Sequence, residues 1–197
     1  MQMLLSHINK FKKINKVTKT ITVVSVFFYL LGIFSLIVNP MIIDGLNLDI
    51  SGFSYSTIYE IFTYPFVHDF HPSHLLFNLS LLILFGNTLE KEIGVKNYIL
   101  LIVFGWVFNF LPMMFLGVDL QIAGLSGIVS SIMFFNIFVS KNTTSSIKLL
   151  GLVFCLDMLL NMMFVDLKKD MTVLGHLLGM FGGVIFTVFY KIKKVTF

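Results

Sequence analysis

Apolar residues along the chain gather into six long stretches that are separated by short polar connections. The stretches span residues 21–38, 74–89, 98–116, 122–139, 149–165 and 172–190. A helix needs about 20 mostly apolar residues, with a range of about 17–25, to cross a hydrocarbon core ~30 Å thick. Several stretches lie near the short limit of that range. The pattern predicts an all-α, polytopic membrane protein with a bundle of six transmembrane helices.

The composition indicates that lipid is the solvent for most of this chain. Of its 197 residues, 57% are apolar and only 12% are charged. Soluble domains carry about 25% charged residues, and a soluble globule of this size could not bury so much apolar surface. The single cysteine, Cys155, lies within an apolar stretch, where a packing role is expected.

The lysines predict how the chain is oriented in the membrane. All 14 basic residues are lysines, and all except Lys168 and Lys169 fall on one side of the predicted spans. By the positive-inside rule, both termini are cytoplasmic. The expected organisation is a basic segment over residues 1–20, a membrane domain over 21–190 and a tail over 191–197. The composition favours a multi-pass protein of a bacterial plasma membrane.

The same charge distribution bears on partners. Without arginine to form bidentate contacts with bases or phosphates, a nucleic-acid partner is not expected. The lysines are expected to meet anionic headgroups of the lipid bilayer. The long connection over residues 39–73 is rich in aromatic side chains and holds only four charges. Such a segment is expected to rest in the headgroup layer on the outer side.

Polar side chains stand at the outer ends of three predicted spans. His74 and Asn78 begin the second span, Ser126 begins the fourth, and His176 begins the sixth. Polar groups in lipid cost free energy unless they face one another or water. We therefore expect these four residues to converge on one interior cavity near the outer surface.

A hydroxyl beside an imidazole is sufficient for acyl transfer, because histidine can accept the proton while serine attacks a carbonyl. His74 and Asn78 are four residues apart, so both point the same way and could donate to an oxyanion. The free N–H groups at a helix start would favour negative charge beside Ser126. Each motif alone is typical of helix packing. Because all of these residues lie on the same side of the membrane and at a similar depth, they favour a catalytic site.

Taken together, the motifs resemble those of the rhomboid intramembrane serine proteases, from Tyr59 to Gly183. The matching parts are a His-x-x-x-Asn, a Gly-x-Ser-Gly and a His-x-x-Gly-x-x-x-Gly, carried by His74, Asn78, Ser126, His176, Gly179 and Gly183. The resemblance implies a dyad of Ser126 as nucleophile and His176 as base. It also implies that His74, Asn78 and the Ser126 N–H stabilise the oxyanion, and that the fifth span gates access for a substrate helix.

Three positions depart from the family pattern. Tyr59-Glu60 stands where many members have Trp-Arg, and Ser130 stands where some members have an aromatic ring that stacks on the base. His68 is six residues before His74, whereas the family spacing is five. None of these changes removes a catalytic atom. The Gly-x-x-x-Gly of Gly179 and Gly183 is expected to pack the sixth span closely on the fourth.

The expected activity is that of a serine endopeptidase that cuts single-span or polytopic membrane proteins near the outer membrane boundary. The alternative is a catalytically silent rhomboid-like protein that binds membrane clients. Loss of the nucleophile or base is the usual mark of that class, and both remain here.

A metal site or other cofactor is not expected. His68, His71 and His74 would align on a helix, but Pro72 disfavours a continuous helix through them. Asp157, with Asn161 four residues later, is expected to face the bundle and form hydrogen bonds there. A transporter that uses Asp157 is a third reading, which is disfavoured because no paired breaks interrupt the spans.

Overall fold

The computed structural model describes residues 14–39, 41–68, 71–116, 121–164 and 171–195. Long helices dominate it, and they are α2 (Lys16–Val38), α5 (Pro72–Leu81), α6 (Asn87–Leu116), α7 (Ser126–Phe138), α8 (Ser145–Phe164) and α9 (Met171–Val195). A π-helix, η3 (Leu82–Gly86), joins α5 to α6. The prediction of an all-α polytopic membrane fold is confirmed.

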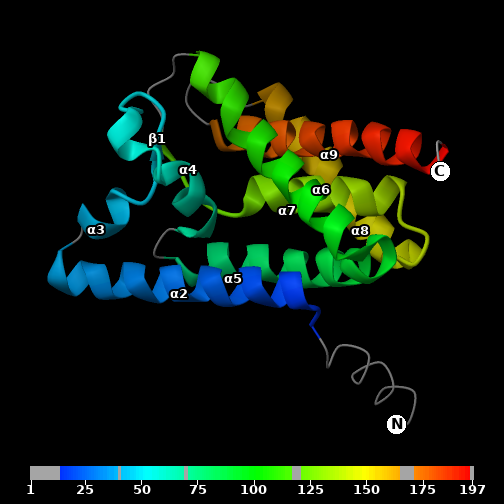
Figure 1. Cartoon of the computed structure of the whole chain (residues 1–197), viewed down its shortest axis with the longest axis horizontal. Coiled ribbons are helices and arrows are strands. Elements are labelled where there is room, and N and C mark those ends of the chain that lie inside the picture. Colours follow the sequence, from blue (N-terminus) through cyan, green and yellow to red (C-terminus); the bar gives the residue numbers. More distant parts are fainter. Residues whose placement is uncertain (1–13, 40, 69–70, 117–120, 165–170, 196–197) are drawn as a thin grey trace, which may run out of the picture.

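The connection after α2 folds into short elements that gather at one end of the bundle (Figure 1). They are α3 (Met41–Asp44), β1 (Leu48–Asp49), η1 (Tyr55–Thr57), α4 (Glu60–Thr63) and η2 (Tyr64–Phe66). The second strand of the small sheet, β2 (Gln121–Ile122), lies just before α7 and pairs antiparallel with β1. This loop assembly is therefore tied directly to the segment that leads into α7.

Within the described residues, three helical stretches are long and apolar enough to cross a membrane: Lys16–Val38, Pro72–Phe115 and Val173–Lys193. The middle stretch, of 44 residues, contains two of the predicted spans. They follow each other almost without a connection, because the chain reverses sharply at Gly94, whose φ of 77° suits glycine. α7 is apolar but has only 13 residues, so the six-span count stays a prediction.

The expected start of the fourth span, at residue 122, is wrong. Residues 121–122 form β2 instead, and Leu48 pairs with Ile122 across the small sheet. Gly124 then takes a φ of +100°, a left-handed conformation that ends the extended segment, and α7 begins at Ser126. The serine is consequently the first residue of its helix rather than a residue inside it.

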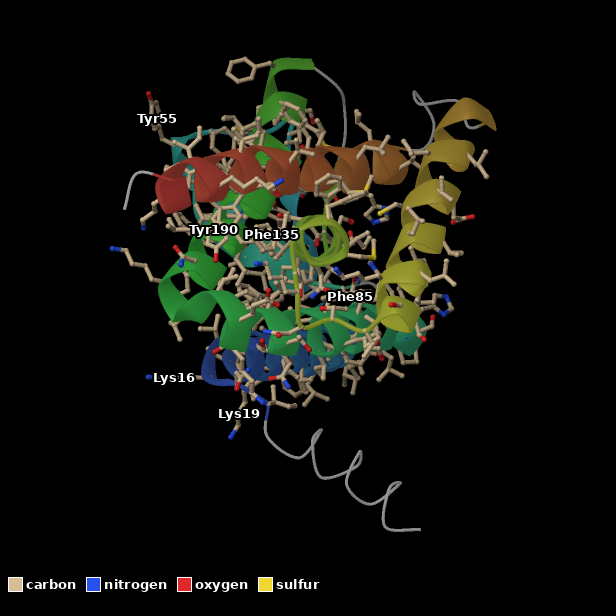
Figure 2. All side chains as sticks on the ribbon, turned by 90° about the vertical axis from the view of Figure 1, so that its right-hand side faces the viewer. Lys16, Lys19, Tyr55, Phe85, Phe135 and Tyr190 are labelled. Carbon is tan, nitrogen blue, oxygen red and sulfur yellow. The ribbon has the colours of Figure 1, made fainter. Side chains whose placement is uncertain are left out.

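α6, α7 and α9 all pack against one another in the middle of the bundle, and α2 lies along α5 (Figure 1). The core between these helices is aromatic and aliphatic, with Phe85, Tyr98, Phe135 and Phe186 fully buried. Phe135 and Tyr190 stack edge to face, with ring centroids 5.4 Å apart. Figure 2 shows Phe85, Phe135 and Tyr190 between the helices, whereas Lys16 and Lys19 point away from the bundle.

Lysines collect at the end of the bundle formed by the start of α2, the start of α6, residues 138–148 and the end of α9. We call this the lysine-rich end; its described lysines are Lys16, Lys19, Lys91, Lys96, Lys141, Lys148, Lys191 and Lys193. The buried Glu90 holds the start of α2 there, because its carboxylate accepts the N–H groups of Val17 and Thr18, each at 2.9 Å. A carboxylate at a helix start is favoured by the helix dipole.

The prediction that Asp157 faces the bundle is wrong. Gly151 and Cys155 form the buried side of α8, and Asp157 is exposed. Residues two apart on a helix point about 200° apart, so a buried Cys155 turns Asp157 outward. The side chain of Asn161, its expected neighbour, lies outside the described residues.

Candidate active site

Two helices that carry candidate residues touch through their backbones. A Cβ atom added to Gly179 on α9 would stand only 2.2 Å from the carbonyl oxygen of Gly127 on α7. One turn further along, a Cβ on Gly183 would stand 2.7 Å from the carbonyl oxygen of Ser131. Only glycine allows so close an approach, and small residues are the usual means of packing helices closely in membranes.

This contact places Ser126 and His176 at the same end of a closely packed helix pair. Ser126 precedes Gly127, and His176 lies three residues before Gly179, on the same face one turn away. Both residues are half-buried. As the first residue of α7, Ser126 also has a backbone N–H that no carbonyl of its own helix can accept.

Asn109 of α6 joins α9 and η2 beside that contact. Its amide nitrogen donates to the carbonyl of Gly175 at 2.8 Å, and its amide oxygen accepts the hydroxyl of Tyr64 at 3.1 Å. The same side chain fills the space beside Gly127, where an added Cβ would come within 2.3 Å of the amide nitrogen. Asn109 therefore contacts both Gly175, which precedes His176, and Gly127, which follows Ser126, and holds the two in place relative to each other.

Burial raises the pKa of Tyr64, so its hydroxyl keeps its proton and remains a donor to Asn109. The carbonyl of Tyr64 in turn accepts the N–H of Gly124 at 2.9 Å. Tyr64 thus links the loop assembly to both α6 and the turn that precedes Ser126.

The imidazole of His74 lies against that same turn. A Cβ on Gly124 would meet Cε1 and Nε2 of His74 at 3.2 and 3.3 Å, so a side chain there would crowd the ring. The ring of His74 also meets the ring of His68 edge to face, with centroids 5.1 Å apart. His68 is itself buried and lies 3.1 Å from the carbonyl of Phe66 through Nδ1. His74 therefore lies next to both His68 and Gly124, and Gly124 is the residue two positions before Ser126.

Asn78 is buried one turn below His74. Its amide nitrogen donates to the backbone carbonyl of His74 at 3.1 Å, and the four-residue spacing puts both side chains on one face of α5. An amide group has two N–H donors, and this bond uses one of them. α5 itself begins at Pro72, a favoured first position, so the helix does not extend back to His71 and His68.

Two of the departures from the family pattern receive a structural account. The hydroxyl of Ser130 donates to the carbonyl of Ser126 at 2.8 Å, so it reaches back along α7. The buried carboxylate of Glu60 accepts the N–H of Asp49 at 3.0 Å, which ties α4 to β1. Glu60 therefore helps to hold the loop assembly together, as does Trp106, whose indole donates to the carbonyl of Ile61 at 2.9 Å.

Sequence reasoning did not single out Asn109 or Tyr64. The available signal for Asn109 was an amide inside the apolar stretch 98–116, since buried polar groups in a membrane span usually bond to a partner. For Tyr64 the aromatic character of the 39–73 connection gave no sign of its partner. Among the described residues, no group of three or more His, Cys, Asp or Glu side chains is arranged to hold a metal ion.

Comparison with known families identifies the fold that carries this site. Residues 55–193 match the Rhomboid domain, and the match covers more than two thirds of the chain. The chain therefore belongs to the rhomboid family. A search of curated proteins gave no significant match.

Proposed function

We propose that this rhomboid-family protein is an intramembrane serine endopeptidase, with Ser126 as nucleophile and His176 as general base. Rhomboid domains usually belong to such proteases. The observation that carries the proposal is the backbone contact of Gly127 with Gly179, because it brings the ends of α7 and α9 that hold a hydroxyl and an imidazole together. No cofactor is needed for this chemistry.

In the proposed reaction, the Ser126 oxygen attacks the scissile carbonyl while His176 accepts the hydroxyl proton. The carbonyl electrons move to oxygen, and the oxyanion accepts hydrogen bonds from the Ser126 N–H, His74 and Asn78. His176 then donates its proton to the leaving amine, which gives an acyl-enzyme. Water attacks the acyl group, with His176 again as base, and releases the acid product and free Ser126.

The substrate would be a single-span or polytopic membrane protein, cut near the outer membrane boundary. Support for lateral access comes from the boundary between α5 and α8. There, Phe77 and Phe154 meet edge to face with centroids 5.3 Å apart, and much of α8 is exposed apolar surface. A boundary that rests on few side chains can open at modest cost, so a substrate helix would enter between α5 and α8.

The same proposal places the protein in a plasma membrane as a multi-pass protein with both termini cytoplasmic, and in a bacterium. The cytoplasmic placement of the termini is supported by the lysine-rich end, which lies opposite the end with Ser126 and His176. The cut would then fall on the extracytoplasmic side.

The test uses detergent-purified full-length protein and a labelled single-span substrate. Wild type should cleave it, and neither Ser126→Ala nor His176→Ala should. Ser80→Ala is the matched control, because this exposed hydroxyl bonds only to the carbonyl of Leu76 on its own helix in the described structure and should not affect cleavage.

The competing function is a silent rhomboid-like protein that binds membrane clients. Wild type that captures the substrate helix but leaves it intact over a broad substrate panel would favour that function. Cleavage that survives in Ser126→Ala would rule out the serine mechanism.

A further inference from the structure

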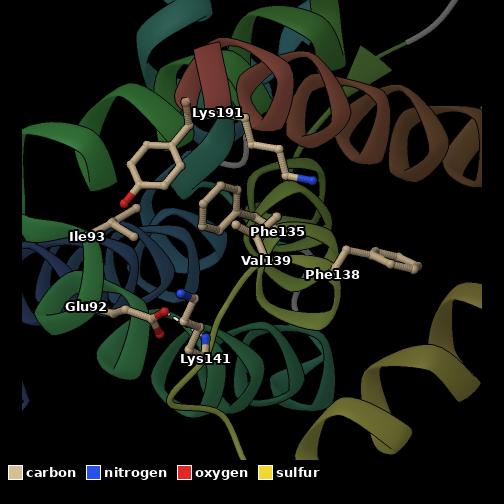
Figure 3. Close-up of a pocket in the computed structure, with 8 residues that line it drawn as sticks. Glu92, Ile93, Phe135, Phe138, Val139, Lys141 and Lys191 are labelled. Atoms are coloured by element: carbon tan, nitrogen blue, oxygen red, sulfur yellow. Dashed lines mark hydrogen bonds between the residues drawn. The ribbon is translucent and has the colours of Figure 1, made fainter. Parts of the chain in front are cut away.

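A groove opens at the lysine-rich end, far from the candidate active site. It has a volume of about 430 Å³ and lies between the start of α6, the end of α7 and the end of α9 (Figure 3). The groove lies at the end of α7 that is opposite to Ser126, and a helix of 13 residues is about 20 Å long. The volume falls within the range of roughly 300–1,000 Å³ that is usual for small-molecule sites.

The wall of the groove is apolar and aromatic. Ile93, Phe135 and Tyr190 are buried there, whereas Phe138 leaves 56% of its surface exposed. Val139, which directly follows the last residue of α7, also lines the groove. An open groove with this lining favours a hydrocarbon chain, because burying apolar surface on both partners is favourable.

The rim of the groove is cationic. Lys141 and Lys191 line it, both are exposed, and Figure 3 shows them on opposite sides of Phe135 and Val139. Glu92 also lines the groove, but its carboxylate is engaged. It accepts the hydroxyl of Ser140 at 2.5 Å and the backbone N–H of Lys141 at 2.7 Å. The carboxylate keeps its negative charge, so the two lysines Lys141 and Lys191 leave the lining with a net charge of +1.

We propose that this groove binds one anionic phospholipid of the leaflet at the lysine-rich end. One acyl chain would lie along Phe138 and Val139, and the phosphate would lie between Lys141 and Lys191. The apolar wall requires a hydrocarbon chain and the two lysines require an anionic group, and a phospholipid carries both. A soluble anion would leave the apolar wall uncovered, and a neutral lipid would leave the lysines without a charged partner. The proposal is independent of the proposed proteolysis.

The test is native mass spectrometry of the full-length protein released from nanodiscs of equal parts phosphatidylglycerol and phosphatidylcholine. Wild type should retain one phosphatidylglycerol. The double variant Lys141→Gln, Lys191→Gln should bind it about 10- to 30-fold more weakly, since each lysine near a membrane surface favours anionic lipid. The matched control is Lys16→Gln, Lys19→Gln, which removes the same charge from the same end but outside the groove and should behave as wild type.

A second variant, Val139→Phe, tests the apolar wall without altering charge. By filling the groove it should lower phosphatidylglycerol retention, and circular dichroism should show an unchanged helix content. Equal loss in both lysine pairs would overturn the proposal in favour of general surface attraction. Displacement of the lipid by millimolar inorganic phosphate would reassign the site to a soluble anion, and retention of phosphatidylcholine at the same level would show that the lysines do not select the ligand.

Discussion

The contact of α7 with α9 and the contact of α5 with α8 are built in opposite ways. α7 and α9 touch backbone to backbone at Gly127 and Gly179, and Asn109 braces them from α6. Between α5 and α8, the described aromatic contact is a single pair of rings, Phe77 and Phe154. The first arrangement cannot shift without steric overlap or a lost hydrogen bond, whereas the second can yield by rotating side chains.

This difference explains how one bundle could hold the reacting groups in a fixed geometry and still admit a substrate helix. The groups proposed to react belong to the helix pair that glycine contacts fix, and a fixed geometry is what proton transfer and oxyanion stabilisation need. The boundary proposed to admit a substrate belongs to the pair with little contact. Four substitutions in and around the two helix pairs test this contrast.

Gly179→Ala should cause the largest loss, because its Cβ would overlap the backbone of Gly127. Overpacking of this kind typically costs about 1–3 kcal/mol, and backbone cannot move aside as a side chain can. The melting temperature in detergent and the cleavage rate should both fall sharply. Gly151→Ala is the matched control on α8, since the atoms nearest its Cβ belong to the side chains of Ile137 and Phe85 and not to backbone. Equal effects of the two substitutions would show that the backbone contact of Gly179 is no more restrictive than a side-chain contact.

Asn78→Ala should slow cleavage without abolishing it. The proposed oxyanion site would lose one donor of several, which typically lowers kcat by about 10²–10³. Turnover with a saturating labelled substrate measures this effect, and KM should change little. Asn97→Ala is the control, since that amide also donates to a carbonyl four residues back along the chain. Unchanged turnover in Asn78→Ala would remove this residue from the oxyanion role.

Asn109→Leu should destabilise the protein moderately. It leaves the carbonyl of Gly175 and the hydroxyl of Tyr64 without the partner that now bonds both. Buried polar groups that lose a partner typically cost about 1–3 kcal/mol. A thermal melt followed by tryptophan fluorescence suits this variant, because Trp106 lies one turn from Asn109 on α6. A melting temperature equal to that of wild type would show that Asn109 does not brace the helices.

Phe154→Ala should give the smallest effect, and in the opposite direction. An aromatic pair contributes roughly 0.5–1.5 kcal/mol beyond its buried area, so its loss should let α5 and α8 separate more often. Cleavage of a transmembrane substrate should become a few-fold faster, whereas the rate with a short water-soluble peptide should not change. Phe27→Ala, on the exposed face of α2, is the control. Slower cleavage of the transmembrane substrate in Phe154→Ala would place the route of access elsewhere.

The helices could be predicted from the sequence because the length of an apolar stretch is a local property of the chain. The positions of the lysines are equally local, and they gave the predicted orientation. The start of α7 could not, because residues 121–122 take their strand conformation from Leu48 and Asp49, more than 70 residues earlier. The outward direction of Asp157 depends on which face of α8 packs, which periodicity did not reveal in a helix that is apolar nearly all round.

For the candidate site, the residue types and their spacing identified His74, Asn78, Ser126 and His176. The parts that position them were not predictable in the same way. Asn109 and Tyr64 act through partners on other elements, and an amide or a hydroxyl in a sequence does not state what it will bond to. The sequence predicted that the sixth span packs closely on the fourth. It did not predict that the backbone of Gly179 would contact the backbone of Gly127.

The most direct test of the central claim is covalent labelling of Ser126 by a serine-reactive fluorophosphonate, followed by peptide mass spectrometry. A hydroxyl reacts with such a probe only when a neighbouring base activates it. We expect label on Ser126 in wild type, with labelling lost in His176→Ala and kept in His71→Ala, an exposed histidine before α5. Labelling of Ser126 that does not depend on His176, or label that is absent from Ser126 in folded wild type, would contradict a Ser126–His176 dyad.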